Sequence, residues 1–320
     1  ATDSNIAHMR QVLDEALKEG ALGLSTGLSY GNAINSSTEE ICELAELLAE
    51  HQGIYTTHMR TEYDGIIDAM HEAFHIGRHA KVPVQISHHK CAGAKNWGRT
   101  KETLALIEKY QAMQDINCDC YPYRAGSSNL DITQVTEDYD ILVTWSSPFP
   151  EVAGKTLKDI AAMWNIDIYQ VAKKIVPAGA IYFQMHEEDV RRVLQHPSSM
   201  VGSDGLPCDP NPHPRLWGTF PRVISHYSRD EKLFPMTTAI YKMTGMSAQR
   251  FSLKDRGFIR ENFFADIVLF DPIKINETST YQDPKQKADG IEYVFVNGVL
   301  TYTAKEMTGN RAGKFLERNK

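Results

Sequence analysis

The sequence predicts a protein of the α/β class, in which a parallel sheet built from strand–helix units precedes a small β region. Over the first third of the chain, apolar segments of about five residues alternate with amphipathic segments of roughly 10–17 residues, the pattern of repeated βα units. From about residue 253 this pattern gives way to short strand-like segments. With 320 residues, the chain is long enough for one large domain and one small domain.

The βα units follow one another from the N-terminus. Gly20 ends the first amphipathic segment, as glycine often does after a helix. Glu39 and Glu40 lie in the first turn of the second helix, where negative charge suits the helix dipole. We expect helices over residues 5–19, 38–51, 64–80 and 100–114, and strands over residues 21–25, 53–58, 82–88 and 116–121.

Residues 125–186 interrupt this alternation. They contain a glycine–serine turn, acidic turns and prolines, together with expected helices over residues 157–164 and 168–174. The segment is too long for an ordinary βα loop and too regularly patterned for a linker. Because an insertion at the carboxyl ends of parallel strands often covers an active site, we expect it to form a lid. The alternation resumes with a helix over residues 187–195 and a strand that ends at Asp204.

The C-terminal part of the chain is expected to form a small β domain. The dipeptide Asn297-Gly298 is a typical hairpin turn between two short apolar segments. We expect strands over residues 257–259, 265–271, 293–296 and 299–300. The expected domains are a partial barrel over residues 1–252, with the insertion at about 125–186, and the β domain over residues 253–320.

Composition argues against several classes of function. The formal net charge of -7 and the pI near 6.0 are not those of a nucleic-acid-binding protein, which usually presents a basic face. No apolar run approaches the ~18 residues of a membrane span, and the first residues carry no secretory signal pattern. The five cysteines are odd in number and unevenly spread, so we expect reduced thiols and a cytoplasmic protein. The oligomeric state stays open.

Three of the expected strands, far apart in the sequence, end in a side chain that can bind a metal or move a proton. These residues are His58, His88 and Asp204. In a barrel of parallel strands all carboxyl ends open on one face, so the three residues are expected to converge there. A lone histidine is more often structural, but two imidazoles in equivalent positions and a carboxylate are the donors of a hydrolytic zinc site. We prefer His88 to His89, because neighbouring side chains of a strand point to opposite faces.

Asp204 and three further side chains are candidates for proton transfer and substrate binding. Asp204 can take a proton from a metal-activated water and pass it to a leaving amine, although an Asp-Gly turn is the structural alternative. Arg215 lies in a proline-rich loop, where its guanidinium can bind a substrate carboxylate through two parallel hydrogen bonds. A surface arginine is the alternative. Tyr30 and Tyr121 are candidates for substrate contact, with simple packing as the alternative.

A series of short motifs runs in order over nearly the whole chain. The motifs are Gly20-Ala21-Leu22-Gly23-Leu24-Ser25-Thr26-Gly27, Thr57-His58-Met59-Arg60, Gln85-Ile86-Ser87-His88-His89-Lys90, Asn96-Trp97-Gly98-Arg99, Tyr121-Pro122-Tyr123, Gly202-Ser203-Asp204-Gly205, His213-Pro214-Arg215 and Ala265-Asp266-Ile267-Val268. Together they resemble the D-aminoacylases, the N-acyl-D-amino-acid deacylases of the amidohydrolase superfamily. The segments Ile141-Leu142-Val143-Thr144-Trp145-Ser146 and Ser87-His88-His89-Lys90-Cys91 are also similar to the N-acyl-D-glutamate deacylase branch.

The resemblance implies an incomplete TIM-type (β/α) barrel of a metal-dependent hydrolase, with a small flanking β-sandwich domain. It also implies a Zn²⁺ cofactor and the hydrolysis of a small-molecule N-acyl-D-amino acid to a D-amino acid and a carboxylate. His58 and His88 would be zinc ligands, and Asp204 would be the general base and acid, near a second metal position. The substrate's carboxylate end would be held by Arg215, Tyr121, Ser127 and Tyr30.

The sequence departs from the family's pattern in one respect. The family carries a His-x-His pair on the first barrel strand and a zinc-binding cysteine downstream of it, but this chain contains no His-x-His. We therefore expect a C-terminal fragment that lacks on the order of 100–200 residues. Two alternatives stay open. One is a cyclic amidohydrolase of the hydantoinase or dihydroorotase kind, and the other is an inactive fragment that lacks part of the metal site.

Overall fold

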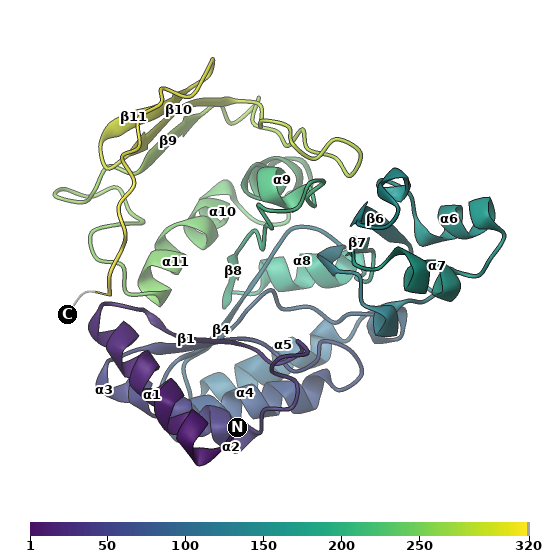
Figure 1. Cartoon of the computed structure of the whole chain (residues 1–320). Coiled ribbons are helices and arrows are strands. Elements are labelled where there is room, and N and C mark those ends of the chain that lie inside the picture. The colour runs from purple at the N-terminus through teal and green to yellow at the C-terminus, as the bar shows by residue number, and fades with distance from the viewer. Residues whose placement is uncertain (319–320) are drawn as a thin grey trace.

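The computed structural model describes residues 1–318, and a five-stranded parallel sheet forms its centre (Figure 1). The strands are β1 (Gly23–Gly27), β2 (Ile54–His58), β3 (Val84–Ile86), β4 (Ile116–Cys120) and β8 (Ser199–Val201), in the order β1-β2-β3-β4-β8. The register pairs Gly27 with His58 and Ile86 with Cys118. Because every pair is parallel, the carboxyl ends of all five strands lie on one edge. Within residues 1–318, β1 and β8 pair with no further strand, so this sheet is open.

Helices join these strands, as the alternating pattern predicts. Thr2 caps the first helix in a reciprocal capping box, and Ser37 accepts the backbone N–H of Glu40 at the start of the second. The single helix expected over residues 38–51 is divided in two. The helices are α1 (Asp3–Lys18), α2 (Thr38–Ala45), α3 (Leu47–Glu50), α4 (Ile66–Ala80), α5 (Thr100–Gln111) and α8 (Glu187–Gln195). Their apolar faces bury Leu17, Leu48, Phe74 and Ile107 completely against the sheet.

The segment expected to form an insertion has a sheet and an apolar core of its own. Its three antiparallel strands lie in the order β5-β7-β6. Val143, Ile160 and Val171 are fully buried in a cluster separate from the main core. In Figure 1 these teal elements extend away from the parallel sheet. They are β5 (Gly126–Asn129), β6 (Ile141–Ser146), α6 (Leu157–Trp164), α7 (Ile168–Ile175) and β7 (Ala178–Tyr182).

The last third of the described chain begins with helices and ends in a second antiparallel sheet. The helices are α9 (Arg215–Arg222), a π-helical continuation over Val223–Asp230, α10 (Met236–Met243) and α11 (Gly245–Arg250). The strands β9 (Ile267–Phe270), β10 (Ile291–Val296) and β11 (Val299–Thr303) lie in the order β11-β10-β9. The hairpin predicted at Asn297-Gly298 is confirmed, and both residues have positive φ.

One expected strand does not form. Residues 257–259 lie outside every strand, so the strand prediction there was wrong. Gly257 has a φ of 80° and lies so close to Ala248 that a Cβ atom would overlap it, which requires a turn instead. Within residues 1–318, this C-terminal region forms one three-stranded sheet and not the two packed sheets of a sandwich.

Two connections bring the C-terminal region back to the rest of the molecule. The segment between β9 and β10 extends over α9 toward the insertion, as the yellow-green loop in Figure 1 shows. The end of the described chain returns to α1, where the Arg318 backbone N–H donates to the Gly20 carbonyl at 2.8 Å. Among residues 1–318, no helix combines the length and the apolar character that a membrane crossing requires.

Candidate functional site

The two histidines expected at strand ends lie side by side. His58 is the last residue of β2, and His88 follows β3 by two residues. Their ring centroids are 4.5 Å apart with an interplanar angle of 70°. The ring of Tyr30, which follows β1, lies 4.9 Å from that of His58. The parallel register therefore brings together three side chains that are 28 to 58 positions apart in the sequence.

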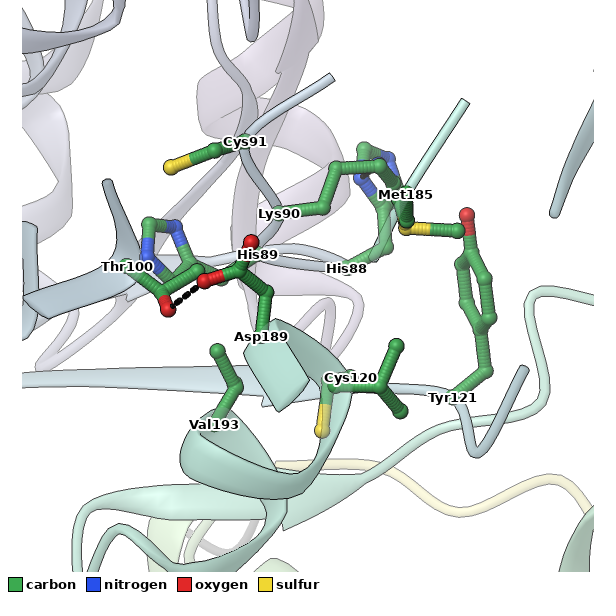
Figure 2. A pocket seen from close by; sticks show the side chains of 11 residues that line it. His88, His89, Lys90, Cys91, Thr100, Cys120, Tyr121, Met185, Asp189 and Val193 are labelled. Atoms are coloured by element: carbon green, nitrogen blue, oxygen red, sulfur yellow. Dashed lines mark hydrogen bonds between the residues drawn. The ribbon is translucent and has the colours of Figure 1, made fainter. Parts of the chain in front are cut away.

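His88 owes its direction to a reversal of the backbone just after β3. Its φ of 40° is left-handed, a costly conformation for a residue with a Cβ. The carboxylate of Asp119 accepts the His88 backbone N–H at 2.8 Å, and the Asp119 carbonyl accepts the N–H of His89 at 2.7 Å. The two side chains consequently diverge, and His89 reaches Thr103 at 2.8 Å. Figure 2 shows the divergence, with His88 and Lys90 toward Tyr121 and His89 toward the opposite side.

Glu62 links His88 to a buried lysine. Its Oε1 lies 2.9 Å from Nδ1 of His88 and 2.5 Å from Nζ of Lys90, and all three residues are at most 9% exposed. Burial alone would raise the pKa of Glu62, but the charges of Lys90 and His88 outweigh it and hold that pKa below its usual range. Burial alone would lower the pKa of Lys90, whereas the carboxylate of Glu62 raises it. Lys90 is therefore an ammonium ion, and its Nζ also lies 2.8 Å from Nδ1 of His88. Both contacts of the His88 ring are thus made at Nδ1, which leaves Nε2 for a ligand.

His58 is a neutral imidazole at neutral pH. Burial lowers its pKa from 6.5 to about 4. Its Nε2 lies 2.7 Å from Oγ of Ser29, whereas its Nδ1 has only a 3.4 Å contact with the hydroxyl of Tyr30. Nδ1 is therefore the less engaged nitrogen. Because a metal ligand must be unprotonated, the environment of this ring favours metal binding over an ion pair.

The described residues supply two of the donors that a zinc ion needs. Two imidazoles, each with one free or weakly engaged ring nitrogen, match the ligand chemistry of zinc. Among residues 1–318, no group of three or more His, Cys, Asp or Glu side chains is arranged as a metal site. Asp204, with a left-handed φ of 48°, instead places its Oδ2 2.8 Å from Nη1 of Arg215. Its charge still acts on His58.

Arg215 forms a buried cationic site with unused donors. Its side chain is 1% exposed, and the guanidinium lies 4.4 Å from the ring centroid of Tyr121. Nη2 donates to the Ser127 carbonyl at 3.4 Å. Nε, Nη1 and the Ser127 hydroxyl are all buried and make no hydrogen bond within residues 1–318, because the Asp204 contact lacks hydrogen-bond geometry. Buried donors without acceptors are costly, so this arrangement suits an anionic ligand such as a carboxylate.

The side chains predicted from the sequence are distributed around this site. Tyr121 is buried and contacts two cations. The guanidinium of Arg215 lies 4.4 Å from its ring centroid and Nζ of Lys90 lies 5.6 Å from it. Tyr30 is 52% exposed at the mouth of the site. A cavity of about 10 Å³, lined by Lys90, Tyr121 and Met185, lies beneath them and has room for one water molecule (Figure 2).

Sequence reasoning missed Glu62 and Asp119 as parts of the site. Glu62 lies in the loop after His58. Asp119 is the fourth residue of β4, on the half-buried face of that strand, where its carboxylate accepts the backbone N–H of His88. A carboxylate within an apolar strand is a signal, because burial demands a partner for it. The partner of Glu62 depends on the backbone reversal at His88, which the sequence pattern did not indicate.

Comparison with known proteins assigns the chain to a family. Residues 157–302 match the model of the amidohydrolase family Amidohydro_3. D-aminoacylase from Alcaligenes xylosoxydans xylosoxydans is 49% identical over 318 residues, which are 99% of this chain and 66% of the relative. A crystal structure of D-aminoacylase superposes with a TM-score of 0.96 at 49% identity, covering 99% of this chain and 67% of that one. The chain belongs to the D-aminoacylase family of amidohydrolases.

Two further structures define where this chain stands within the superfamily. N-acyl-D-glutamate deacylase from Bordetella bronchiseptica, complexed with zinc and a phosphonate mimic of the tetrahedral intermediate, has a TM-score of 0.92 at 40% identity. The match covers 94% of this chain and 64% of that one. L-hydantoinase from Arthrobacter aurescens has a TM-score of 0.58 at 12% identity over 99% of this chain and 72% of that one, which shows a shared fold alone. This chain spans about two thirds of the length of the D-aminoacylase relative.

Proposed function

We propose that the chain is part of a zinc-dependent hydrolase that converts N-acyl-D-amino acids to D-amino acids and carboxylates. The observation that carries the proposal is the placement of an imidazole pair beside a buried guanidinium whose Nε and Nη1 make no hydrogen bond within residues 1–318. Asp204 connects the two halves, since it contacts Arg215 and its charge acts on His58. A substrate with an amide next to a carboxylate fits such a site. The family membership supports the same reaction over the cyclic amidohydrolase alternative.

In this proposal His58 and His88 hold the metal. A bound zinc ion would polarise the amide carbonyl and lower the pKa of the attacking water. Glu62 and Lys90 both contact Nδ1 of His88, which orients the ring so that Nε2 is presented to the metal. The Lys90 ammonium, also held by Glu62, adds positive charge where the carbonyl oxygen becomes negative during attack.

Arg215 exchanges one carboxylate for another when substrate binds. In the free chain its guanidinium holds Asp204 at 2.8 Å. A substrate carboxylate reaching Nε and Nη1 of Arg215 and the hydroxyl of Ser127 competes with Asp204 for the same charge. The released Asp204 then serves as the base that takes the proton of the attacking water and returns it to the leaving amine nitrogen. Tyr121 supports the guanidinium from below, and Tyr30 borders the entrance.

The proposal extends to the organisation of the chain. The open parallel sheet is consistent with part of a (β/α) barrel over residues 1–252, and the C-terminal sheet with part of a β-sandwich domain over residues 253–320. The insertion at about 125–186 supplies Ser127 to the anion site, which supports its role as a lid. Reduced cysteines, all five without disulfide partners, support a cytoplasmic location.

The test is hydrolysis of N-acetyl-D-methionine, N-acetyl-D-glutamate and their L-enantiomers by zinc-loaded protein. We expect turnover of the D-enantiomers only, and the ratio between the two D-substrates then assigns the branch of the family. Higher identity to D-aminoacylase than to the N-acyl-D-glutamate enzyme favours the methionine derivative. Equal rates for D- and L-substrates would contradict the proposal. Zinc binding without any turnover would favour the inactive alternative.

A further inference from the structure

The segment between β9 and β10 reaches the wall of the anion site from the C-terminal region. In Figure 1 it crosses α9 on the way toward the insertion. Two of its side chains, Glu277 and Tyr281, contact residues that surround Arg215. They lie 62 and 66 positions beyond Arg215 in the sequence, and neither belongs to the groups assigned above to metal, proton transfer or substrate.

Tyr281 packs against the histidine that orients the backbone of Arg215. The His213 ring is 3% exposed and lies between two tyrosine rings, with centroids 5.1 Å from Tyr123 and 5.1 Å from Tyr281, both edge to face. Nδ1 of His213 accepts the backbone N–H of Arg215 at 2.9 Å. Tyr281 also packs against Phe183, the residue that follows β7, with 4.9 Å between the two ring centroids. A shift of Tyr281 would therefore free the ring that fixes the first residue of α9.

Glu277 fixes the second tyrosine of this arrangement. Its Oε2 accepts the hydroxyl of Tyr123 at 2.8 Å, and its Oε1 pairs with Arg222. Arg222 also donates to the Pro122 carbonyl at 2.7 Å. The packing against α9 is tight, because a Cβ on Gly218 would lie 2.5 Å from the Tyr123 hydroxyl and 3.2 Å from Glu277. The carboxylate thus holds α9 and the Tyr123 ring in one position.

We propose that Glu277 and Tyr281 are positioning residues that hold the Arg215 guanidinium in register with a substrate carboxylate. The inference rests on the proposed function, because it assumes that Arg215 binds that carboxylate. Neither residue contacts the histidine pair, so both act on carboxylate recognition and not on metal binding. Their loss misdirects a planar group whose two parallel hydrogen bonds depend on its orientation.

The test compares an acid with its amide in the full 320-residue chain. Dissociation constants are measured calorimetrically on zinc-free protein, which does not turn the ligands over, for N-acetyl-D-methionine and N-acetyl-D-methioninamide. The proteins compared are wild type, Tyr281→Ala, Tyr281→Phe and Glu277→Gln, and their zinc content is measured separately. We expect Tyr281→Ala and Glu277→Gln to weaken acid binding about tenfold, within the ~10²-fold that a 1 Å misplacement can cost. Amide binding and zinc content should stay unchanged, and Tyr281→Phe, which keeps the ring, should bind like wild type.

Control measurements distinguish a specific effect on carboxylate binding from a general loss of folding, and from failure of the proposed function. Tyr293→Ala removes a tyrosine that is 44% exposed on β10 and should change neither dissociation constant. Equal weakening of acid and amide would mean that Tyr281 and Glu277 only stabilise the fold, and would overturn the inference. Unchanged acid binding in both variants would also overturn it. If wild type fails to bind the acid, the proposed function itself is refuted.

Discussion

Replacement of Glu62 by glutamine should weaken zinc binding while leaving the shape of the site intact. The carboxylate lies 2.9 Å from Nδ1 of His88 and pairs with the buried ammonium of Lys90. Glutamine is similar in size but neutral, so it removes the negative charge that both partners face. His88 then loses the interaction that orients its ring and raises its basicity as a ligand.

The magnitude follows from these two contacts. Loss of an outer carboxylate partner typically reduces metal affinity ~10–100-fold, equivalent to about 1.4–2.7 kcal/mol. Breaking a buried ion pair from one side costs about 3–5 kcal/mol of stability, because the remaining charge is left without a partner. Since Glu62 is 7% and Lys90 6% exposed, solvent gives little relief. We therefore expect a marginally stable variant with a zinc dissociation constant at least tenfold higher.

Chelator competition measures the zinc dissociation constant, and urea unfolding measures the free energy of unfolding of the apo protein. The control is Glu188→Gln, the same change at a side chain that is 66% exposed on α8, which should alter both quantities negligibly. If Glu62→Gln binds zinc as tightly as wild type, then His88 is not oriented through Glu62. If the free energy of unfolding of Glu62→Gln also equals that of wild type, then the ion pair between Glu62 and Lys90 does not stabilise the folded protein.

Three further results are expected. Asp204→Asn should lower turnover by at least roughly 10²-fold with zinc content unchanged, as assayed by steady-state kinetics and elemental analysis, because an amide cannot accept the proton. Gly23→Ala should cost about 1–3 kcal/mol in urea unfolding, since its Cβ would lie 1.9 Å from the Ile54 carbonyl, while Gly31→Ala, with no atom within 4 Å, should not. Burial lowers the pKa of His196 below 6.5, so the unfolded chain takes up the proton first. His196 should therefore lower stability below about pH 6.5, by at most about 1.4 kcal/mol per pH unit, and His196→Gln should reduce the measured slope by that contribution.

Most helices and the adjacent positions of His58 and His88 could be predicted from the sequence. Strong periodicity located α1, α4 and α5 to within a few residues, and α6 and α8 were predicted with their observed bounds. His58 and His88 were found because each directly follows an apolar run, and parallel strands bring such positions to one edge. A local pattern combined with one topological rule is sufficient for this part of the site.

The contacts that complete the site depend on backbone conformations that periodicity does not encode. His88 and Asp204 both have left-handed φ values, of 40° and 48°, and these directions decide which groups they meet. That Asp204 is a metal ligand stays a prediction, and the sequence pattern did not indicate that its carboxylate also pairs with Arg215. The approach of Glu277 and Tyr281 to the anion site depends on a long connection in the C-terminal region, and no sequence period predicts where such a segment packs.

The most direct measurement is the zinc content of a His58→Ala/His88→Ala double variant by elemental analysis after dialysis against zinc at a stated free concentration. The matched control is His75→Ala/His79→Ala, which removes two exposed histidines from one face of α4. We predict that wild type and control bind zinc equally and that the double variant loses it. Equal zinc content in all three proteins would contradict a metal site built on His58 and His88, and with it the proposed hydrolytic mechanism.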